Sequence, residues 1–334
     1  MNKSVCMTIM AILIIFASSL FSQDIHFSQF MREPMFLNPA LTGNIGNCII
    51  RAGANYKSQW DKTYVTQSAF IDGRISPAGI TGNTNFGIGG SFFSDVAGDG
   101  NFKDNYFTFN MAIHKSFNAY RTIWGSLGLA AGLGNISIDY SRFYFDSQWN
   151  GFTFDINTPS NENFPGASFS YFDINTGVNL HITDKNKKFN TVIGLSAYHI
   201  NRPVYSFFTT NIKLQRRYSS YLKTNIFLGL NTLRPAVYYS FQNGAQELIT
   251  GMNIKYDMNI AKLYYGIWFR VFSEIIPLVG IDYKHLSVMI SYDIGITTNN
   301  TFEQYKNGLE LSIIKVFCYS ETKLYDKLTT PCDN

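Results

Sequence analysis

The chain lacks any long hydrophobic run after residue 22. A transmembrane helix needs about 18–20 consecutive apolar residues, so we expect no such helix in the rest of the chain. Charged residues are also scarce, at 15% of the sequence, and only 9 residues are proline. The formal net charge of +4 is too small to indicate a nucleic-acid partner. These absences exclude helical membrane proteins and nucleic-acid-binding proteins.

Motifs of enzyme chemistry are absent as well. No HExxH motif, no GxxxxGK[ST] loop and no complete GxSxG elbow occurs, because "GIGGSFF" and "GLSAY" each miss the final glycine. The histidines show no metal-binding spacing, and we interpret them as polar packing: His26, His114, His181, His199 and His285. The sequence therefore predicts a protein with no catalytic residues, no metal and no cofactor.

The first 22 residues have the features of a secretory signal peptide. Lys3 provides the positive start, "MTIMAILIIFASSLF" the apolar core, and Ser22 a small residue before Gln23. This order of features is typical of a leader that is cleaved after export. We predict a signal peptide over 1–22, cleavage near Ser22 and Gln23, and a mature protein outside the cytoplasm.

Strict alternation of apolar and polar residues is the main pattern of the mature chain. In "YFTFNMAIHKSF", residues 106–117, Phe107, Phe109, Met111 and Ile113 alternate with Thr108, Asn110, Ala112 and His114. A strand with one apolar and one polar face has this period. Strands of β-sandwiches usually have about 5–6 residues, whereas strands that cross a bilayer have about 9–11. This segment has the length of a membrane strand.

Fourteen segments follow the same pattern, and an even number is typical of bacterial outer-membrane barrels. The sequence predicts an all-β fold: a closed, antiparallel transmembrane β-barrel of about 14 strands over residues 48–318. An irregular plug-like segment precedes it at 23–47, and a periplasmic tail follows at 319–334. The predicted strands are 48–58, 63–73, 84–94, 106–117, 122–138, 168–182, 189–200, 214–230, 235–243, 246–256, 261–272, 275–283, 286–294 and 308–318.

The alternation also predicts which side chains face the lumen. An arginine on the lipid face costs about 2–4 kcal/mol at the bilayer midplane, so Arg270 should point inward. The lipid face of the strand at 168–182 carries Phe172, Ile174, Val178 and Leu180. The lumen-facing residues predicted from the polar parity are Asn110, Asp173, Asn175 and Arg270.

The connections indicate how the barrel is oriented. If the first strand runs outward, most periplasmic turns are short, and the longest link, 139–167, lies outside together with "SDVAGDGNFKDN". Short periplasmic turns and long outer loops are expected of such barrels, and both termini are then periplasmic. The periplasmic turns are rich in Lys and Arg. This charge suits an acidic periplasmic partner, and it equally suits a solvated edge.

Three cysteines remain in the mature chain: Cys48, Cys318 and Cys332. Cys48 opens the first strand and Cys318 closes the last, and these strands are neighbours in a closed barrel. A bridge requires Cα atoms within about 7 Å. The sequence leaves three alternatives open: a Cys48–Cys318 bridge, a Cys318–Cys332 bridge, or free buried thiols.

Residues 23–47, "QDIHFSQFMREPMFLNPALTGNIGN", precede the first strand and have no regular period. Pro34 and Pro39 exclude a continuous helix or strand. The many apolar side chains are unsuited to a free tail in water, since a disordered leader is polar. We predict that the segment docks in the barrel, with a tight turn at Asn38–Pro39 and a bend at Gly43.

Several blocks resemble one known family. "QDIHFSQFMREPMFLNPALTG", "RAGANYKSQW" and "YVTQSAFIDGRI" are similar to the start of the PorP/SprF family of type IX secretion, and "DVAGDGNF", "GLSAYHINRPVYSF", "YYGIWFR" and "SYDIG" resemble its later blocks. The chain departs from the family at Arg32–Glu33, where the family is apolar or small, and at "NGLELSI".

The resemblance implies an outer-membrane accessory of protein secretion in Bacteroidota-like bacteria, without enzyme activity. The implied partners are other type IX secretion components or the C-terminal domain of a secreted adhesin, with lipid around the barrel. The alternative is a channel for small hydrophobic molecules, similar to fatty-acid transporters. The candidate plug or partner-binding residues are Phe27, Phe30, Phe36, Leu37, Asn38, Pro39, Trp60, His199, Arg202 and Pro203.

Overall fold

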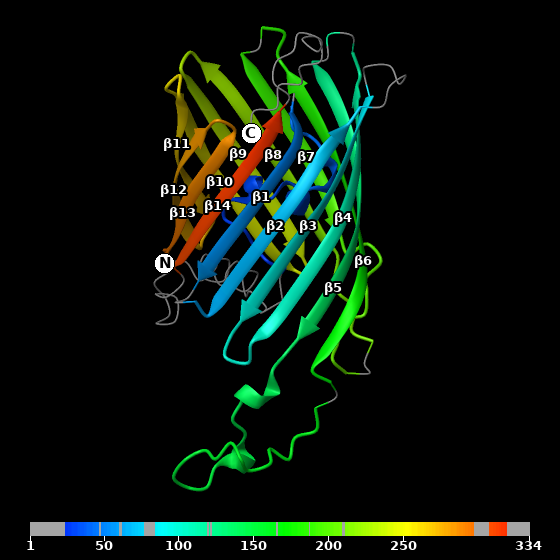
Figure 1. The fold of residues 1–334 in the computed structure, drawn as a ribbon, viewed down its shortest axis with the longest axis vertical. Coiled ribbons are helices and arrows are strands. Elements are labelled where there is room, and N and C mark those ends of the chain that lie inside the picture. The colour runs from blue at the N-terminus through cyan, green and yellow to red at the C-terminus, as the bar shows by residue number, and fades with distance from the viewer. Residues whose placement is uncertain are drawn as a thin grey trace, which may run out of the picture.

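The computed structural model describes residues 24–46, 48–59, 62–76, 84–118, 120, 122–164, 166–186, 188–208, 211–296 and 307–318. In this part of the chain, fourteen strands form a closed antiparallel barrel, which confirms the predicted fold class (Figure 1). The predicted signal peptide (1–22), Trp60, Cys332 and the predicted tail (319–334) lie outside the described residues. The strands are β1 (Cys48–Gln59), β2 (Tyr64–Ile75), β3 (Thr84–Ala97), β4 (Phe102–Ser116), β5 (Ile123–Ser137), β6 (Ser168–Thr183), β7 (Phe189–Tyr198), β8 (Arg217–Leu228), β9 (Asn231–Gln242), β10 (Ala245–Asp257), β11 (Ala261–Arg270), β12 (Glu274–Tyr283), β13 (Leu286–Gly295) and β14 (Gly308–Cys318).

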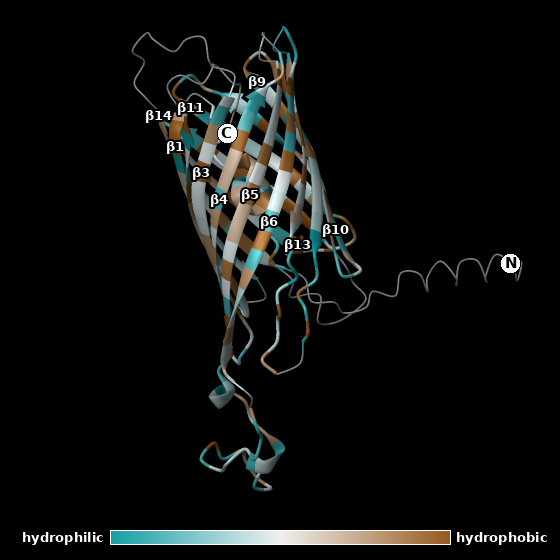
Figure 2. Cartoon of the chain, turned by 90° about the vertical axis from the view of Figure 1, so that its right-hand side faces the viewer, coloured by the Kyte–Doolittle hydropathy of each residue, from teal (hydrophilic) through white to brown (hydrophobic). Residues whose placement is uncertain are grey.

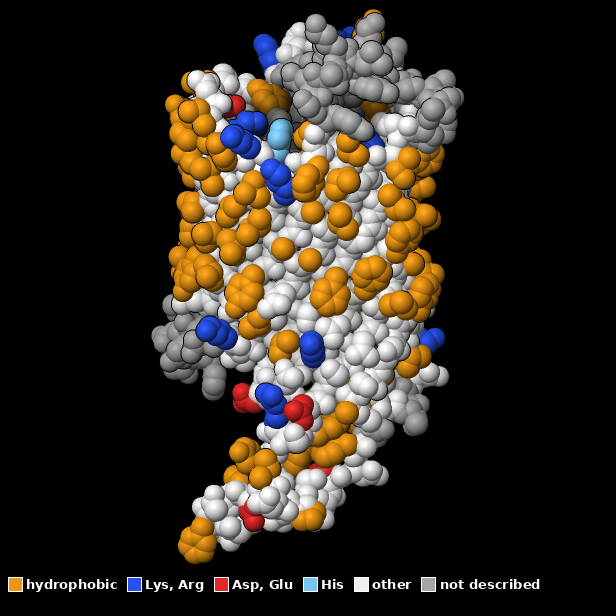
Figure 3. Space-filling model, viewed as in Figure 1, with side chains coloured by type: hydrophobic (Ala, Val, Ile, Leu, Met, Phe, Trp, Pro, Cys, Tyr) orange, Lys and Arg blue, Asp and Glu red, His pale blue; other side chains and the backbone are white. Residues whose placement is uncertain are grey.

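Side chains alternate between the two faces of the barrel wall. Met111 is 53% exposed on the outside, whereas its neighbour Asn110 is 1% exposed inside. The hydropathy colours of Figure 2 alternate along the strands in the same way, and Figure 3 shows a band of hydrophobic side chains between Lys and Arg side chains at the two rims of this face. The outer surface therefore has the apolar band of a membrane barrel. Among the described residues, no helix is long and apolar enough to span a membrane.

Two prolines lie inside strands of the barrel. The segment predicted at 235–243 begins at Asn231 instead, so Pro235 is internal to β9. The pairing of β9 with β8 lapses beside Pro235, and the pairing of β12 with β13 lapses beside Pro277. Proline has no backbone N–H to donate to the ladder, which explains both interruptions.

The two ends of the barrel differ in their connections. We call the end with Cys48 and Cys318 the disulfide end, and the opposite end the arm end. At the arm end the β5–β6 connection forms an arm (residues 138–164) that projects away from the barrel (Figures 1 and 2). It contains two short helices, η3 (Tyr140–Arg142) and η4 (Asp146–Gln148). The other long loop predicted here is short instead, because β3 extends to Ala97 and β4 starts at Phe102.

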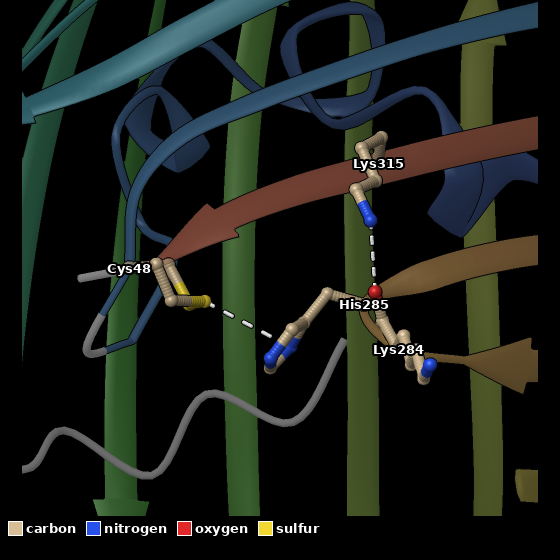
Figure 4. Close-up of a disulfide and its surroundings, with 5 residues drawn as sticks. Cys48, Lys284, His285 and Lys315 are labelled. Atoms are coloured by element: carbon tan, nitrogen blue, oxygen red, sulfur yellow. Dashed lines mark hydrogen bonds between the residues drawn. A yellow bond between two sulfur atoms is a disulfide. The ribbon is translucent and has the colours of Figure 1, made fainter. Parts of the chain in front are cut away.

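A disulfide joins the first strand to the last. Cys48 and Cys318 are register partners of β1 and β14, their Cα atoms lie 4.0 Å apart, and their sulfurs are bonded (Figure 4). His285 Nδ1 lies 3.8 Å from Cys318 Sγ. Of the alternatives left open by the sequence, the structure contains the bridge across the closure of the barrel.

Residues 24–46 lie inside the barrel, and we call them the lumen segment (Figure 1). They form three short helical turns, η1 (Phe30–Arg32), α2 (Pro34–Leu37) and η2 (Pro39–Leu41). Pro34 and Pro39 each stand at the start of a turn, where the missing N–H of proline is tolerated. The prediction that both termini lie at the same end is wrong for the described chain. Asp24 contacts residues at the arm end, such as Gln242, whereas Cys318 lies at the disulfide end.

Candidate functional site: the lumen segment and its barrel contacts

The lumen segment is largely buried, and it contacts strands around the whole barrel. Phe27, Phe30, Leu37 and Asn38 are each at most 6% exposed. The first residues of the segment contact the arm end, and the last ones lead into β1 at the disulfide end. The segment therefore crosses the lumen from one end to the other.

Asp24 is held at the arm end by three barrel residues. Its carboxylate lies 2.8 Å from His199 Nε2 and 3.3 Å from Arg217 Nε, and it accepts a 2.9 Å hydrogen bond from Gln242 Nε2. The other ring nitrogen of His199 lies 2.8 Å from Asp173. His199 adopts a positive φ of 57° just after β7, and this backbone turn directs the ring between the two carboxylates.

The charges of this cluster reinforce one another. Burial by itself would raise the pKa of Asp24, but the charges of His199 and Arg217 outweigh burial and hold the pKa of Asp24 well below its usual value. Burial would likewise lower the pKa of His199, but Asp24 and Asp173 outweigh it and raise the pKa to about 9. His199 is therefore a cation at neutral pH and links the lumen segment to the barrel wall.

A second charged cluster holds Ser28 and Gln29. The carboxylate of Glu310 accepts hydrogen bonds from the backbone N–H groups of Ser28, at 2.7 Å, and Gln29, at 3.1 Å. The Ser28 hydroxyl donates to Asp293 at 2.6 Å and accepts from Lys57 Nζ at 2.9 Å. Lys57 itself lies 3.2 Å from Asp293. Hydrogen bonds to charged groups are roughly twice as strong as neutral ones, so this cluster fixes the segment in register with β14.

Beyond Glu33, the segment is held mainly by close packing and neutral hydrogen bonds. The Asn38 side chain donates to the carbonyl oxygens of Val178 and Leu195, both at 3.1 Å. A Cβ atom on Gly128 would lie 2.2 Å from the backbone N of Ala40. The η2 turn therefore packs directly on the backbone of the barrel wall, which leaves no room for a side chain at position 128.

The end of the segment shows the same kind of contact. A Cβ atom on Gly87 would lie 1.9 Å from the carbonyl oxygen of Thr42, and His114 Nε2 is 2.8 Å from that oxygen. Gly43 has a φ of +70° and donates its N–H to Asp72 at 2.7 Å. The bend predicted at Gly43 therefore lies where the chain turns toward β1.

Aromatic side chains pack the segment against the wall. Phe30 stacks on Tyr238 at 5.0 Å between ring centroids and meets Trp268 edge-on at 5.6 Å. Phe36 meets Phe27 and Phe93 edge-on, at 5.5 Å and 5.4 Å. Edge-on and offset pairs of this kind add roughly 0.5–1.5 kcal/mol each beyond burial.

The candidate residues from the sequence fall into several places. Those of the lumen segment lie inside the barrel as described above, with Pro39 at the start of η2, and His199 contacts the segment directly. Arg202 and Pro203 instead lie in the β7–β8 connection, where they bond Gln215 and Leu214. The predicted lumen-facing residues lie on the inner face: Asn110, Asp173, Asn175 and Arg270, the last paired with Glu247 and Glu274.

Four residues that hold the segment were not selected from the sequence: Lys57, Arg217, Asp293 and Glu310. Each is a charged residue on the inward parity of a strand whose other face is apolar, as in "LELSI", where Glu310 lies between Leu309 and Leu311. A single charged residue within a strand that is long enough to cross the bilayer is the sequence signal that could have identified these four residues. Their pairing with the segment could not be read from the sequence, because most of it joins distant positions: Ser28 lies 265 residues from Asp293 and 282 residues from Glu310.

The arrangement is suited to holding a peptide. No group of three or more His, Cys, Asp or Glu residues that would hold a metal ion occurs in the described ranges.

Comparisons with known proteins agree on the architecture. A family model described as the type IX secretion system membrane protein PorP/SprF matches residues 19–314. No curated protein sequence matches the chain. Among solved structures, the CymD monoaromatic hydrocarbon channel has a TM-score of 0.51 at 10% identity, over 86% of this chain and 93% of CymD.

Two further structures are more distant. A FadL homologue of Pseudomonas aeruginosa has a TM-score of 0.49 at 10% identity, over 90% of this chain and 95% of its own. CdiB from Acinetobacter baumannii has a TM-score of 0.46 at 8% identity, over 82% of this chain, which spans 60% of CdiB. At such identities the likeness to CymD shows the fold alone.

Proposed function

Because the chain belongs to the PorP/SprF family of type IX secretion system membrane proteins, we propose that it is a non-enzymatic outer-membrane accessory of type IX protein secretion. It links the secretion machinery to the outer membrane or receives the C-terminal sorting domain of a cognate surface protein. Its partners are therefore other secretion components or that domain, with outer-membrane lipid around the barrel. In this proposal the disulfide end faces the periplasm and the arm lies outside.

The observation that carries the proposal is the occupied lumen. The lumen segment crosses the barrel and is fixed by buried charges at Asp24 and at Ser28. Two cavities beside it have volumes of about 90 and 310 Å³. A barrel whose lumen is filled by its own chain is suited to binding partner proteins at its rims and at the arm.

A channel for small hydrophobic molecules remains the alternative function. It requires a continuous apolar path through the lumen. The inner face instead carries Asn110, Asp173 and Asn175, each at most 1% exposed, and the charged clusters of the lumen segment lie across the path. These contacts favour the secretion role.

The test is export of a reporter fused to the C-terminal sorting domain of a cognate surface protein. Deletion of the gene should abolish surface display, and the wild-type gene should restore it. A variant lacking residues 24–42 behind an intact signal peptide is assayed in parallel, with heat-modifiable migration as the control for barrel assembly. Normal export in the gene deletion strain would contradict the proposal, and solute conductance by the intact protein in planar bilayers would favour the channel.

A further inference from the structure

A cavity of about 90 Å³ lies between the lumen segment and the wall, toward the disulfide end. Four cations line it: Arg32, Arg51, Lys223 and Arg234. No carboxylate belongs to its lining among the described residues. Since a water molecule needs about 15 Å³ of such space, the cavity has room for about six waters or for a small organic ion.

Arg51 and Arg32 differ in their partners. Arg51 is paired with Asp72 at 2.7 Å. Arg32 is buried, and its three hydrogen bonds go to neutral oxygens of Ser287 and Ser312, at 2.9–3.1 Å. A guanidinium has five N–H donors, so two of those of Arg32 have no acceptor in the described part of the chain.

Apolar side chains complete the cavity. Leu37 and Leu41 of the lumen segment and Val192, Leu278 and Met289 of the wall line it, and all five belong to one buried hydrophobic cluster. Sites for small organic molecules combine such apolar walls with a few fixed polar groups that orient the ligand. A simple inorganic anion would leave these walls unused.

The cavity has a larger neighbour at the disulfide end. A second cavity of about 310 Å³ lies there, lined by Lys255, Lys262 and Tyr264 among others, and Ile314 lines both cavities. The Arg234 guanidinium lies over the Tyr264 ring at 5.6 Å and donates to Asn225 at 3.0 Å. These two contacts fix the orientation of Arg234, which lines the first cavity.

We propose that this cavity binds a carboxylate joined to a short apolar chain, with the carboxylate against Arg32, Lys223 and Arg234 and the chain against the leucines of the lumen segment. The planar guanidinium matches a carboxylate with two parallel hydrogen bonds. Two sources share this chemistry, a fatty acid and the C-terminal residue of a peptide.

The test is calorimetric titration of the full-length protein in detergent with hexanoate, hexanamide, acetate and inorganic phosphate. Hexanoate should bind with a Kd of about 1 mM or lower, and the other three at least tenfold more weakly, because each lacks the charge or the chain. Equal binding of hexanamide or phosphate, or no binding of hexanoate, would overturn the proposal.

Matched variants locate the site. Arg234→Gln and Lys223→Gln should each weaken hexanoate binding at least tenfold, and Arg234→Lys should restore part of it. Lys262→Gln removes the same charge from the neighbouring cavity and should leave the Kd unchanged. Heat-modifiable migration verifies that each variant is folded, and unchanged affinity in both folded cavity variants contradicts the assignment.

The two sources are separated with a pentapeptide that ends in leucine, titrated as the free acid and as the amide. Tighter binding of the acid than of hexanoate assigns the site to a peptide C terminus. Tighter binding of hexanoate assigns it to a fatty acid.

Discussion

The lumen segment has two halves that are held by different forces. Residues 24–33, the charged half, contact the wall through Asp24, His26, Ser28 and Gln29, whose barrel partners are mostly ionised. Residues 34–46, the packed half, rest their backbone on bare glycines and bond mainly to neutral groups.

This difference separates two ways in which a segment can be fixed inside a barrel. The charged half depends on protonation states and on buried ion pairs, and the loss of one partner leaves the other charge uncompensated. The packed half depends on space, since backbone and wall are already in contact. The charged half should therefore respond to pH and charge substitutions, and the packed half to added volume.

The largest expected effect is the addition of one methyl group under the packed half. Gly87→Ala would place a Cβ atom 1.9 Å from the Thr42 carbonyl oxygen, so the segment must lift from the wall at a cost of about 3 kcal/mol. Tryptic cleavage after Arg32, followed by mass spectrometry of the folded barrel in detergent, should increase strongly. Gly90→Ala on the same strand is the control, because its nearest neighbour is at 3.5 Å; equal cleavage in the two variants would contradict the packing argument.

Removal of one charge from the barrel partners of the charged half should have the next largest effect. Glu310→Gln weakens the bonds to the N–H groups of Ser28 and Gln29, and we expect a loss of about 2 kcal/mol in unfolding free energy. Urea unfolding followed by tryptophan fluorescence measures it. Glu162→Gln on the exposed arm is the matched control, and equal stability of the two variants would show that Glu310 does not anchor the segment.

A smaller effect is expected from pH at the His199 cluster. His199 has a pKa raised from 6.5 to about 9, so its contribution is complete below about pH 6.5 and is lost as the pH rises through 9. Asp24 has a depressed pKa, so its contribution is present above its ordinary value of 3.8 and is lost only in strong acid. We expect the unfolding free energy to fall by about 1–2 kcal/mol between pH 6.5 and 9.

The control for this prediction is His199→Gln, which should flatten the slope. The groups that face His199 are Asp24 of the segment and Asp173 of β6, with Arg217 of β8 on the far side of Asp24 and Tyr106 of β4 beside Asp173. An unchanged slope in the variant would assign the pH dependence to another group.

The smallest effect on the lumen segment should come from loss of the disulfide. Double substitution of Cys48→Ser and Cys318→Ser leaves the β1–β14 ladder intact, so cleavage after Arg32 should stay at the wild-type level. The whole barrel should nevertheless unfold more easily, by about 2–4 kcal/mol, because the unfolded chain gains freedom. Strong cleavage after Arg32 would show that the closure of the barrel, and not the two halves of the segment, controls docking.

Much of the local structure could be predicted from the sequence. The alternation in residues 106–117 and 168–182 assigned Met111 outward and Asn110 inward, because a period of two is a property of each strand alone. The start of the strand near Pro235 was misjudged, since β9 begins at Asn231 and the proline only interrupts its ladder with β8. The position of Asp24 was also misjudged, because the sequence of residues 23–47 does not indicate in which direction the segment crosses the lumen.

The sequence by itself determined the barrel, the inner and outer faces of its strands, and the need to bury residues 23–47. Periodicity and apolar content are properties of short stretches of sequence, so they do not depend on the rest of the fold. The tertiary structure alone decided which distant residues meet. Asp24 with His199, Ser28 with Glu310, and Cys48 with Cys318 join positions separated by 175, 282 and 270 residues. Such pairs depend on the register of every strand between them, so they exist only once the barrel has closed.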